Sequence, residues 1–120
     1  MTILNLHIEQ RRVLIASNTE ATLINGNVGT MSKLFPIPHA NAVVVGRGLV
    51  HFIFQVFMDC CLRGVDFDGT VKAFPQIAAA RLVDLHAEIK KARVDVPTNL
   101  YIVLVGWSTA RQEMVPQLAI

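Results

Sequence analysis

The chain has little charge and few cysteines, and each shortage excludes a class of function. Only 17% of its 120 residues are charged, the net charge is +2, and the 11 Lys and Arg residues are scattered. This balance provides no basic patch for nucleic acid. The longest apolar segment, Leu49 to Leu62, is broken by polar residues and is too short to span a bilayer. We therefore expect neither a nucleic-acid partner nor a membrane partner.

The two cysteines are placed so that neither a structural zinc site nor a stabilising disulfide is expected. Cys60 and Cys61 are adjacent, so they form neither a C-x-x-C zinc pair nor a loop-closing disulfide. Reduced thiols and the lack of a signal-peptide pattern fit a cytoplasmic protein. The histidines show no paired spacing (His7, His39, His51 and His86). We expect no metal site and no cofactor.

What the sequence does contain is apolar residues, 52% of the total. This fraction is high for a chain with so few charges. We expect partners or further chain to cover part of the surface, and a homo-oligomer is the simplest arrangement that does so.

A β-hairpin is predicted from Thr2 to Thr22. Apolar residues flank a polar cluster at 9–12, as in two antiparallel strands joined by a tight turn. The second apolar run, 13–16, is nearly continuous, which is typical of a strand covered on both faces. We expect this hairpin to share one sheet with a strand over 42–46 and a hairpin over 101–120.

Two helices are predicted between these strands. Over 49–63 polar residues recur every four positions, which predicts a helix packed on most of its sides and ended by Gly64. The second helix begins at about Thr70 or Pro75, with Pro75 in its first turn, and continues to Arg93. Its predicted buried face is Ile77, Ala80, Leu82, Leu85 and Ile89. The order of strands, two helices and strands indicates an α+β fold.

Short motifs give weak signals for other functions. Gly46-Arg47-Gly48 follows a predicted strand, but the dinucleotide fingerprint needs a third glycine where His51 stands. Asp66-x-Asp68-Gly69 opens like a calcium loop without its later ligands, so a helix-capping turn is the better interpretation. Residue counts leave a Ser/His/Asp triad open, although no G-x-S-x-G pattern is present.

In their order and spacing, the segments together resemble the proteasome-type N-terminal nucleophile (Ntn) hydrolases. The resemblance covers the hairpin from Thr2 to Thr22, then Lys33 to Ile37, then the 43–48 strand and turn, and the 101–118 hairpin. It implies an αββα sandwich, two sheets between two pairs of helices, and subunits that form rings. Residues 1–120 would be a single domain that matches the first half of the family's domain. This N-terminal portion has two helices packed on antiparallel sheet.

The resemblance also implies a site. Thr2 falls at the family's nucleophile and Lys33 at the lysine beside it, while the Gly46, Arg47 and Gly48 turn falls where a backbone N–H binds the oxyanion. Thr22 falls at a position lining the cleft for a peptide substrate. Once Met1 is removed, Thr2 would carry a free α-amino group, which titrates near about pH 7.7–8.0 and is able to activate the hydroxyl.

Three departures from the family pattern argue against present activity. Asn18 stands where the family uses an aspartate, and a neutral amide does not balance the charge of Lys33. Arg47 falls at an oxyanion-loop glycine. Family members also continue beyond the equivalent of Ile120 with segments that supply a catalytic serine and a second aspartate. Two hypotheses follow: a Thr2-dependent peptide or amide hydrolase, and a non-catalytic homo-oligomeric assembly module with the same fold.

Overall fold

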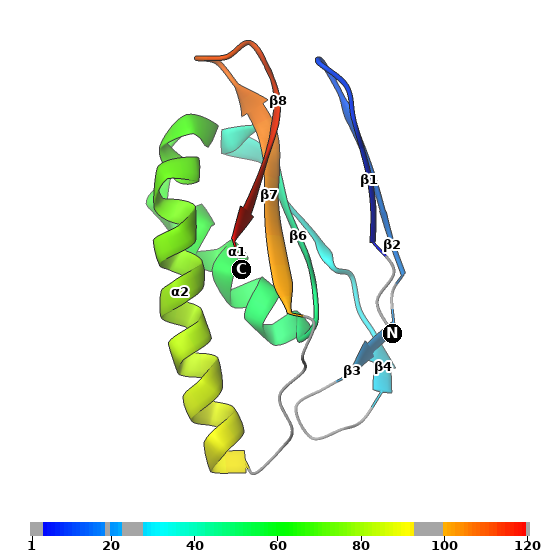
Figure 1. Cartoon of the computed structure of the whole chain (residues 1–120), viewed down its shortest axis with the longest axis vertical. Helices are drawn as coiled ribbons and strands as arrows, with labels where there is room; N and C mark the ends of the chain where they lie inside the picture. Colours follow the sequence, from blue (N-terminus) through cyan, green and yellow to red (C-terminus); the bar gives the residue numbers. More distant parts are fainter. Residues whose placement is uncertain (1–3, 19, 23–27, 93–99, 120) are drawn as a thin grey trace.

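The computed structural model describes residues 4–18, 20–22, 28–92 and 100–119, and these form an α+β fold. Two helices cover one face of a central four-stranded sheet, and a β-hairpin covers the other face (Figure 1). Every strand pair is antiparallel. The predicted fold class is therefore confirmed at this level.

The central sheet has the strand order β5-β6-β7-β8. Its strands are β5 (Leu34–Ile37), β6 (Ala42–Arg47), β7 (Tyr101–Ser108) and β8 (Glu113–Ala119). A short 3-10 turn, η1 (Pro38–Ala40), joins β5 to β6. The strands predicted over 42–46 and 101–120 are confirmed. Because β6 and β7 are central and covered on both faces, they are almost entirely buried.

Both predicted helices are present, with one boundary different from the prediction. α1 (Val50–Arg63) ends where Gly64 adopts φ 64°. α2 (Phe67–Ala92) begins earlier than expected, because Asp66 accepts the Gly69 N–H at 2.9 Å and so caps the helix ahead of Phe67.

The placement of Pro75 in the first turn of α2 is therefore wrong. Pro75 lies inside the helix, on its exposed side, where only one helical hydrogen bond is lost and tertiary packing on both flanks keeps the helix continuous. The predicted buried face is right for Ile77, Leu85 and Ile89. Ala80 is exposed and Leu82 is half-buried, since the face turned to the sheet passes through Phe74 and Ala78 instead.

The N-terminal hairpin is a sheet of its own, which corrects the prediction of one shared sheet. β1 (Leu4–Ile8) pairs only with β2 (Val13–Ser17) among the described strands. Its inner side chains pack face to face on the central sheet at Val45, Val103 and Val105 (the hairpin contributes Leu4, Leu6, Val13 and Ile15). Two shorter strands, β3 (Glu20–Thr22) and β4 (Val28–Thr30), pair with each other beyond it.

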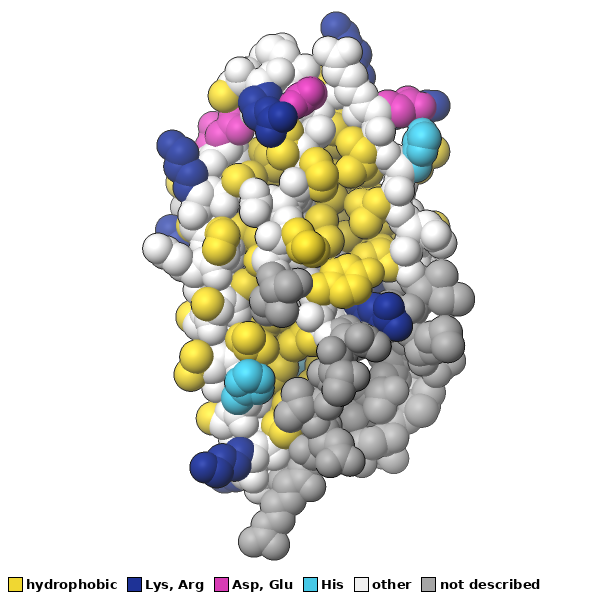
Figure 2. Space-filling view, in the orientation of Figure 1, with side chains coloured by type: hydrophobic (Ala, Val, Ile, Leu, Met, Phe, Trp, Pro, Cys, Tyr) yellow, Lys and Arg dark blue, Asp and Glu magenta, His cyan; other side chains and the backbone are white. Residues whose placement is uncertain are grey.

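Two predictions of burial are wrong: that the second hairpin strand is covered on both faces, and that α1 is packed on most of its sides. β2 alternates between half-buried and exposed residues, and Leu14 is 57% exposed. On α1 the side chains of Phe54, Met58 and Leu62 are exposed. Apolar side chains also reach the surface along the middle of the molecule (Figure 2). Within the described residues, no helix is both long enough and apolar enough to cross a membrane.

Candidate active site

Lys33 is the most unusual side chain among the described residues, because it is charged and only 2% exposed. It precedes β5 directly, and the pairing of that strand with β6 fixes the backbone around it. Its Nζ donates a hydrogen bond of 3.0 Å to Oδ1 of Asn18. A long cationic side chain is rarely this buried unless it is paired or has a function.

Asn18 follows the last residue of β2 and is half-buried. The register of the hairpin places Leu4, the first described residue, across from Ser17, the neighbour of Asn18. The beginning of β1 therefore lies at the same end of the hairpin as the contact between Asn18 and Lys33. The structure brings together two predicted site residues that are 15 positions apart in the sequence.

The third predicted part, the glycine turn, lies beside Lys33. Leu34 pairs with Val45, so Lys33, one residue earlier, enters the sheet level with Gly46, one residue later. Gly46 has no room for a side chain, since a Cβ there would lie 2.8 Å from the Tyr101 carbonyl oxygen. Close backbone contact is thus the reason for glycine at this position.

The turn that follows is also specific to glycine. Gly48 has φ +114°, which side-chain-bearing residues rarely adopt, and a Cβ there would collide with Leu100. Arg47, between the two glycines, is half-buried as the last residue of β6 and pairs with Tyr101. These contacts fix the backbone conformation at the end of β6, next to the buried Lys33.

Two predicted site residues are less fully described. Thr2 lies outside the described residues. Thr22 is the last residue of β3 and pairs with Val28 of β4. The site that the structure describes therefore consists of Lys33, Asn18 and the turn from Gly46 to Gly48.

The described residues of this site are suited to stabilising a negative charge on a bound molecule. It offers the buried side chain of Lys33 beside the glycine turn at the end of β6. A positive charge acts most strongly where water is excluded, as it is around a side chain that is 2% exposed. The described residues hold no group of three or more His, Cys, Asp or Glu side chains suited to a metal ion.

The thiols do not provide an alternative nucleophile. Burial, and after it the neighbouring Cys61 and Asp59, raises the pKa of the Cys60 thiol to about 12. Burial also raises the pKa of Cys61. A thiol is nucleophilic as its thiolate, so neither cysteine is activated at neutral pH.

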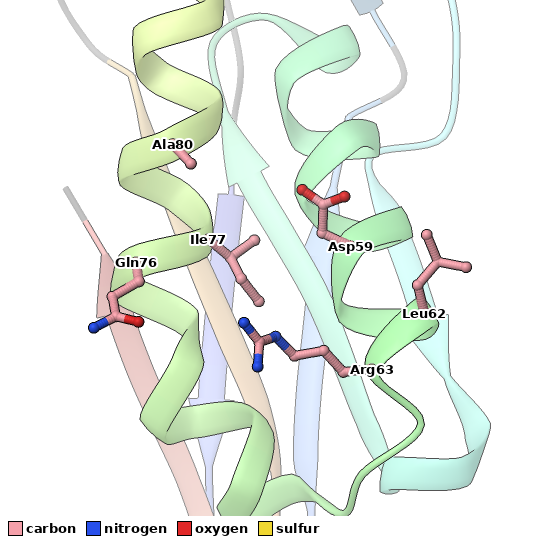
Figure 3. A pocket seen from close by; sticks show the side chains of 6 residues that line it. All are labelled: Asp59, Leu62, Arg63, Gln76, Ile77 and Ala80. Carbon is pink, nitrogen blue, oxygen red and sulfur yellow. The ribbon is translucent and has the colours of Figure 1, made fainter.

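A pocket away from Lys33 and the glycine turn lies between α1 and α2 and has a volume of about 400 Å³. Figure 3 shows Arg63 extending from α1 toward α2, where the Ile77 side chain points toward it. Asp59 at its rim accepts two hydrogen bonds from Arg81, of 2.7 and 2.9 Å, which lower the pKa of that carboxyl. No predicted site residue lines this pocket.

A polar network that sequence reasoning missed joins the start of α2 to the turn between β7 and β8. Asp68 accepts hydrogen bonds from the Ser108 hydroxyl at 2.6 Å, the Thr109 hydroxyl at 3.1 Å and the Ala110 N–H at 3.2 Å. These bonds, that of Ser108 first, lower the pKa of Asp68. The only sequence signal was the acidic turn before the helix, since its partners are about 40 positions away.

Comparison with protein-family models, with curated proteins and with solved structures finds no significant match to this chain.

Proposed function

We propose that this chain is an N-terminal nucleophile hydrolase-like domain that cleaves peptide or amide bonds with Thr2 as the nucleophile. The observation that carries the proposal is the buried Lys33, which donates to Asn18 at 3.0 Å beside the Gly46–Gly48 turn. In the Ntn family the same three parts surround the nucleophile. The layers described above also agree with the first half of an αββα sandwich.

Chain connectivity supports the assignment of Thr2. Leu4 lies opposite Ser17, next to Asn18, and a two-residue segment spans at most about 7 Å. Leu4, two residues after Thr2 in the sequence, therefore lies at the end of the hairpin where Lys33 meets Asn18, which supports the choice of Thr2 as the nucleophile. In the proposed mechanism, the α-amino group of a Met1-processed chain takes the hydroxyl proton as the hydroxyl oxygen attacks the substrate carbonyl. The ammonium so formed gives this proton to the leaving amine as the C–N bond breaks, and water then hydrolyses the ester to a carboxylic acid and regenerates the Thr2 hydroxyl. Lys33 keeps this amine in its basic form by its positive charge, and an N–H of the glycine turn binds the oxyanion.

Asn18 weakens this mechanism compared with an aspartate. Its amide oxygen orients Lys33 through the 3.0 Å hydrogen bond, but it does not compensate the positive charge. We therefore propose slow hydrolysis, which rises with pH as the α-amino group loses its proton near about pH 7.7–8.0.

The test is covalent labelling of a Met1-processed sample by a threonine-directed electrophile, beside the Thr2→Ala variant. The proposal expects labelling of the wild type alone. Equal labelling of both proteins would eliminate it. Asn18→Asp serves as a second comparison, because a carboxylate next to Lys33 should increase the labelling rate.

The neutral Asn18 also favours a second function, an assembly module that keeps the fold without catalysis. In that case neither Met1 removal nor Asn18→Asp would produce labelling, while the protein would still form a homo-oligomer.

A further inference from the structure

Arg47 is the residue of the site that has no part in the proposed hydrolysis. It is the last residue of β6 and lies between Gly46 and Gly48, whose close contacts hold the backbone on both sides of it. The residue is half-buried, although a guanidinium group keeps its charge at every physiological pH. A charged group that is partly withdrawn from water is normally bound to a group of opposite charge.

The side chain of Arg47 lies on the face of the central sheet that the N-terminal hairpin covers. Side chains alternate between the two faces along a strand, and Val45, two residues earlier, packs against the hairpin. Tyr101, directly across from Arg47 on β7, packs against the same cluster. Arg47 is therefore directed into the layer between sheet and hairpin, at the end of β6 where Lys33 enters the sheet level with Gly46.

This end of the layer is the one at which β1 begins. The hairpin turn lies at the far end of the sheet, because the Met114 N–H, near the start of β8, donates to the Gln10 carbonyl oxygen at 2.8 Å. The opposite end of the hairpin, where β1 begins and β2 ends, is joined to Lys33 through Asn18. Arg47 and Lys33 are thus two cationic side chains at one end of the layer.

Arg47 forms no ion pair within residues 4–18, 20–22, 28–92 and 100–119. In the same part of the chain Arg12, Arg81 and Arg111 each pair with an acidic side chain. A planar guanidinium binds a carboxylate through two parallel hydrogen bonds, and the attraction is stronger where water is partly excluded. The half-buried Arg47 is therefore suited to a carboxylate that a bound molecule brings with it.

We propose that Arg47 makes the site selective for peptides with an aspartate or glutamate side chain beside the bond that is cleaved. Arg47 belongs to the turn proposed to bind the oxyanion, so a carboxylate that reaches its guanidinium comes from a residue next to the scissile bond. Acidic side chains titrate at about pH 4, so they are fully ionised near pH 8, where the α-amino group becomes basic. The inference rests on the proposed hydrolase function for the cleavage step, whereas binding of the carboxylate needs no catalysis.

The first part of the test measures binding alone, by NMR titration of the Thr2→Ala protein at low ionic strength. The two probes are Ala-Ala-Glu-Ala and Ala-Ala-Gln-Ala, both acetylated and amidated so that only the glutamate side chain provides a carboxylate. The glutamate peptide should bind roughly 10-fold more tightly. Equal affinities, or no measurable binding of either peptide, would overturn the proposal.

Variants then assign the preference to Arg47. The 10-fold difference should disappear in Arg47→Gln, remain in part in Arg47→Lys, and be unchanged in Arg63→Gln, whose arginine is exposed at the end of α1. A preference that survives in Arg47→Gln would overturn the role of Arg47. The comparison of the two peptides on one protein needs no variant at this position, so it decides the matter even if Arg47→Gln folds poorly.

The second part separates this inference from the hydrolase proposal. In a Met1-processed sample, the glutamate peptide should protect Thr2 from a threonine-directed electrophile at a roughly 10-fold lower concentration than the glutamine peptide. Labelling that both peptides slow equally would overturn the selectivity and leave the hydrolase proposal intact. Binding that depends on Arg47 and on glutamate, in a protein whose Thr2 is never labelled, would support the carboxylate site and eliminate hydrolysis by Thr2.

Discussion

Replacing Lys33 by methionine should leave the protein at least as stable as the wild type. The side chain is 2% exposed, and placing an ammonium group in such a site costs several kcal/mol of effective desolvation free energy. The hydrogen bond to Asn18 is one contact that offsets part of that cost, and a bond to a charged group contributes about 1.5–3 kcal/mol. Methionine has a similar unbranched shape and carries no charge. We therefore expect the free energy of unfolding to rise by about 0–2 kcal/mol.

The assay is urea denaturation at one fixed protein concentration, which keeps any effect of self-association equal among the variants. Lys72→Met on the exposed side of α2 is the control and should change stability by less than about 0.5 kcal/mol. A loss of more than about 1 kcal/mol in Lys33→Met would refute the reasoning. Such a loss would mean that Lys33 stabilises the fold, and its burial would then not indicate a catalytic role.

Three further predictions concern the packing around the site and the polar contacts. Gly46→Ala should destabilise the fold by about 1–3 kcal/mol, because the new Cβ meets the Tyr101 carbonyl oxygen at 2.8 Å, whereas Gly29→Ala, with nothing within 4 Å, should be nearly neutral in the same denaturation assay. The pKa of Asp68 is lowered in the folded state, so its ionised carboxylate stabilises the fold above about pH 4, and this stabilisation is lost as the pH falls through the folded-state pKa. The Tm difference between wild type and Asp68→Asn should therefore shrink on acidification. A Tm difference that grows would contradict this prediction. A double-mutant cycle on Asp59 and Arg81, whose side chains are 27% and 30% exposed, should give a coupling free energy of about 0.5–1 kcal/mol. A value near zero would show that this ion pair does not contribute to stability.

The sequence predicted the elements of this fold better than their assembly. Apolar periodicity located α1 and the strands of the central sheet, because local patterns reflect which side of an element is buried. It did not reveal that the hairpin packs on the sheet face to face, since the same apolar residues at Leu4 and Ile15 serve an edge contact or a face contact equally well. The start of α2 was misjudged because the capping by Asp66 outweighed the proline signal at Pro75.

The site was predicted by resemblance rather than by pattern. Nothing local to Lys33 or Asn18 indicates that they meet, because 15 residues and two short strands separate them. The glycine requirement at Gly46 was equally invisible, as it arises from a carbonyl at Tyr101, on the neighbouring strand. Contacts made across strands depend on register, and register follows from the whole fold.

The central claim, that Lys33 acts on Thr2, is tested most directly by the rate at which a threonine-directed electrophile labels Thr2. The rate would be measured by peptide mass in Met1-processed wild type, Lys33→Met and Lys72→Met. We predict labelling at Thr2 that is roughly 10²-fold slower in Lys33→Met and unchanged in Lys72→Met. Labelling of Lys33→Met at the wild-type rate, or attachment at another residue, would contradict it.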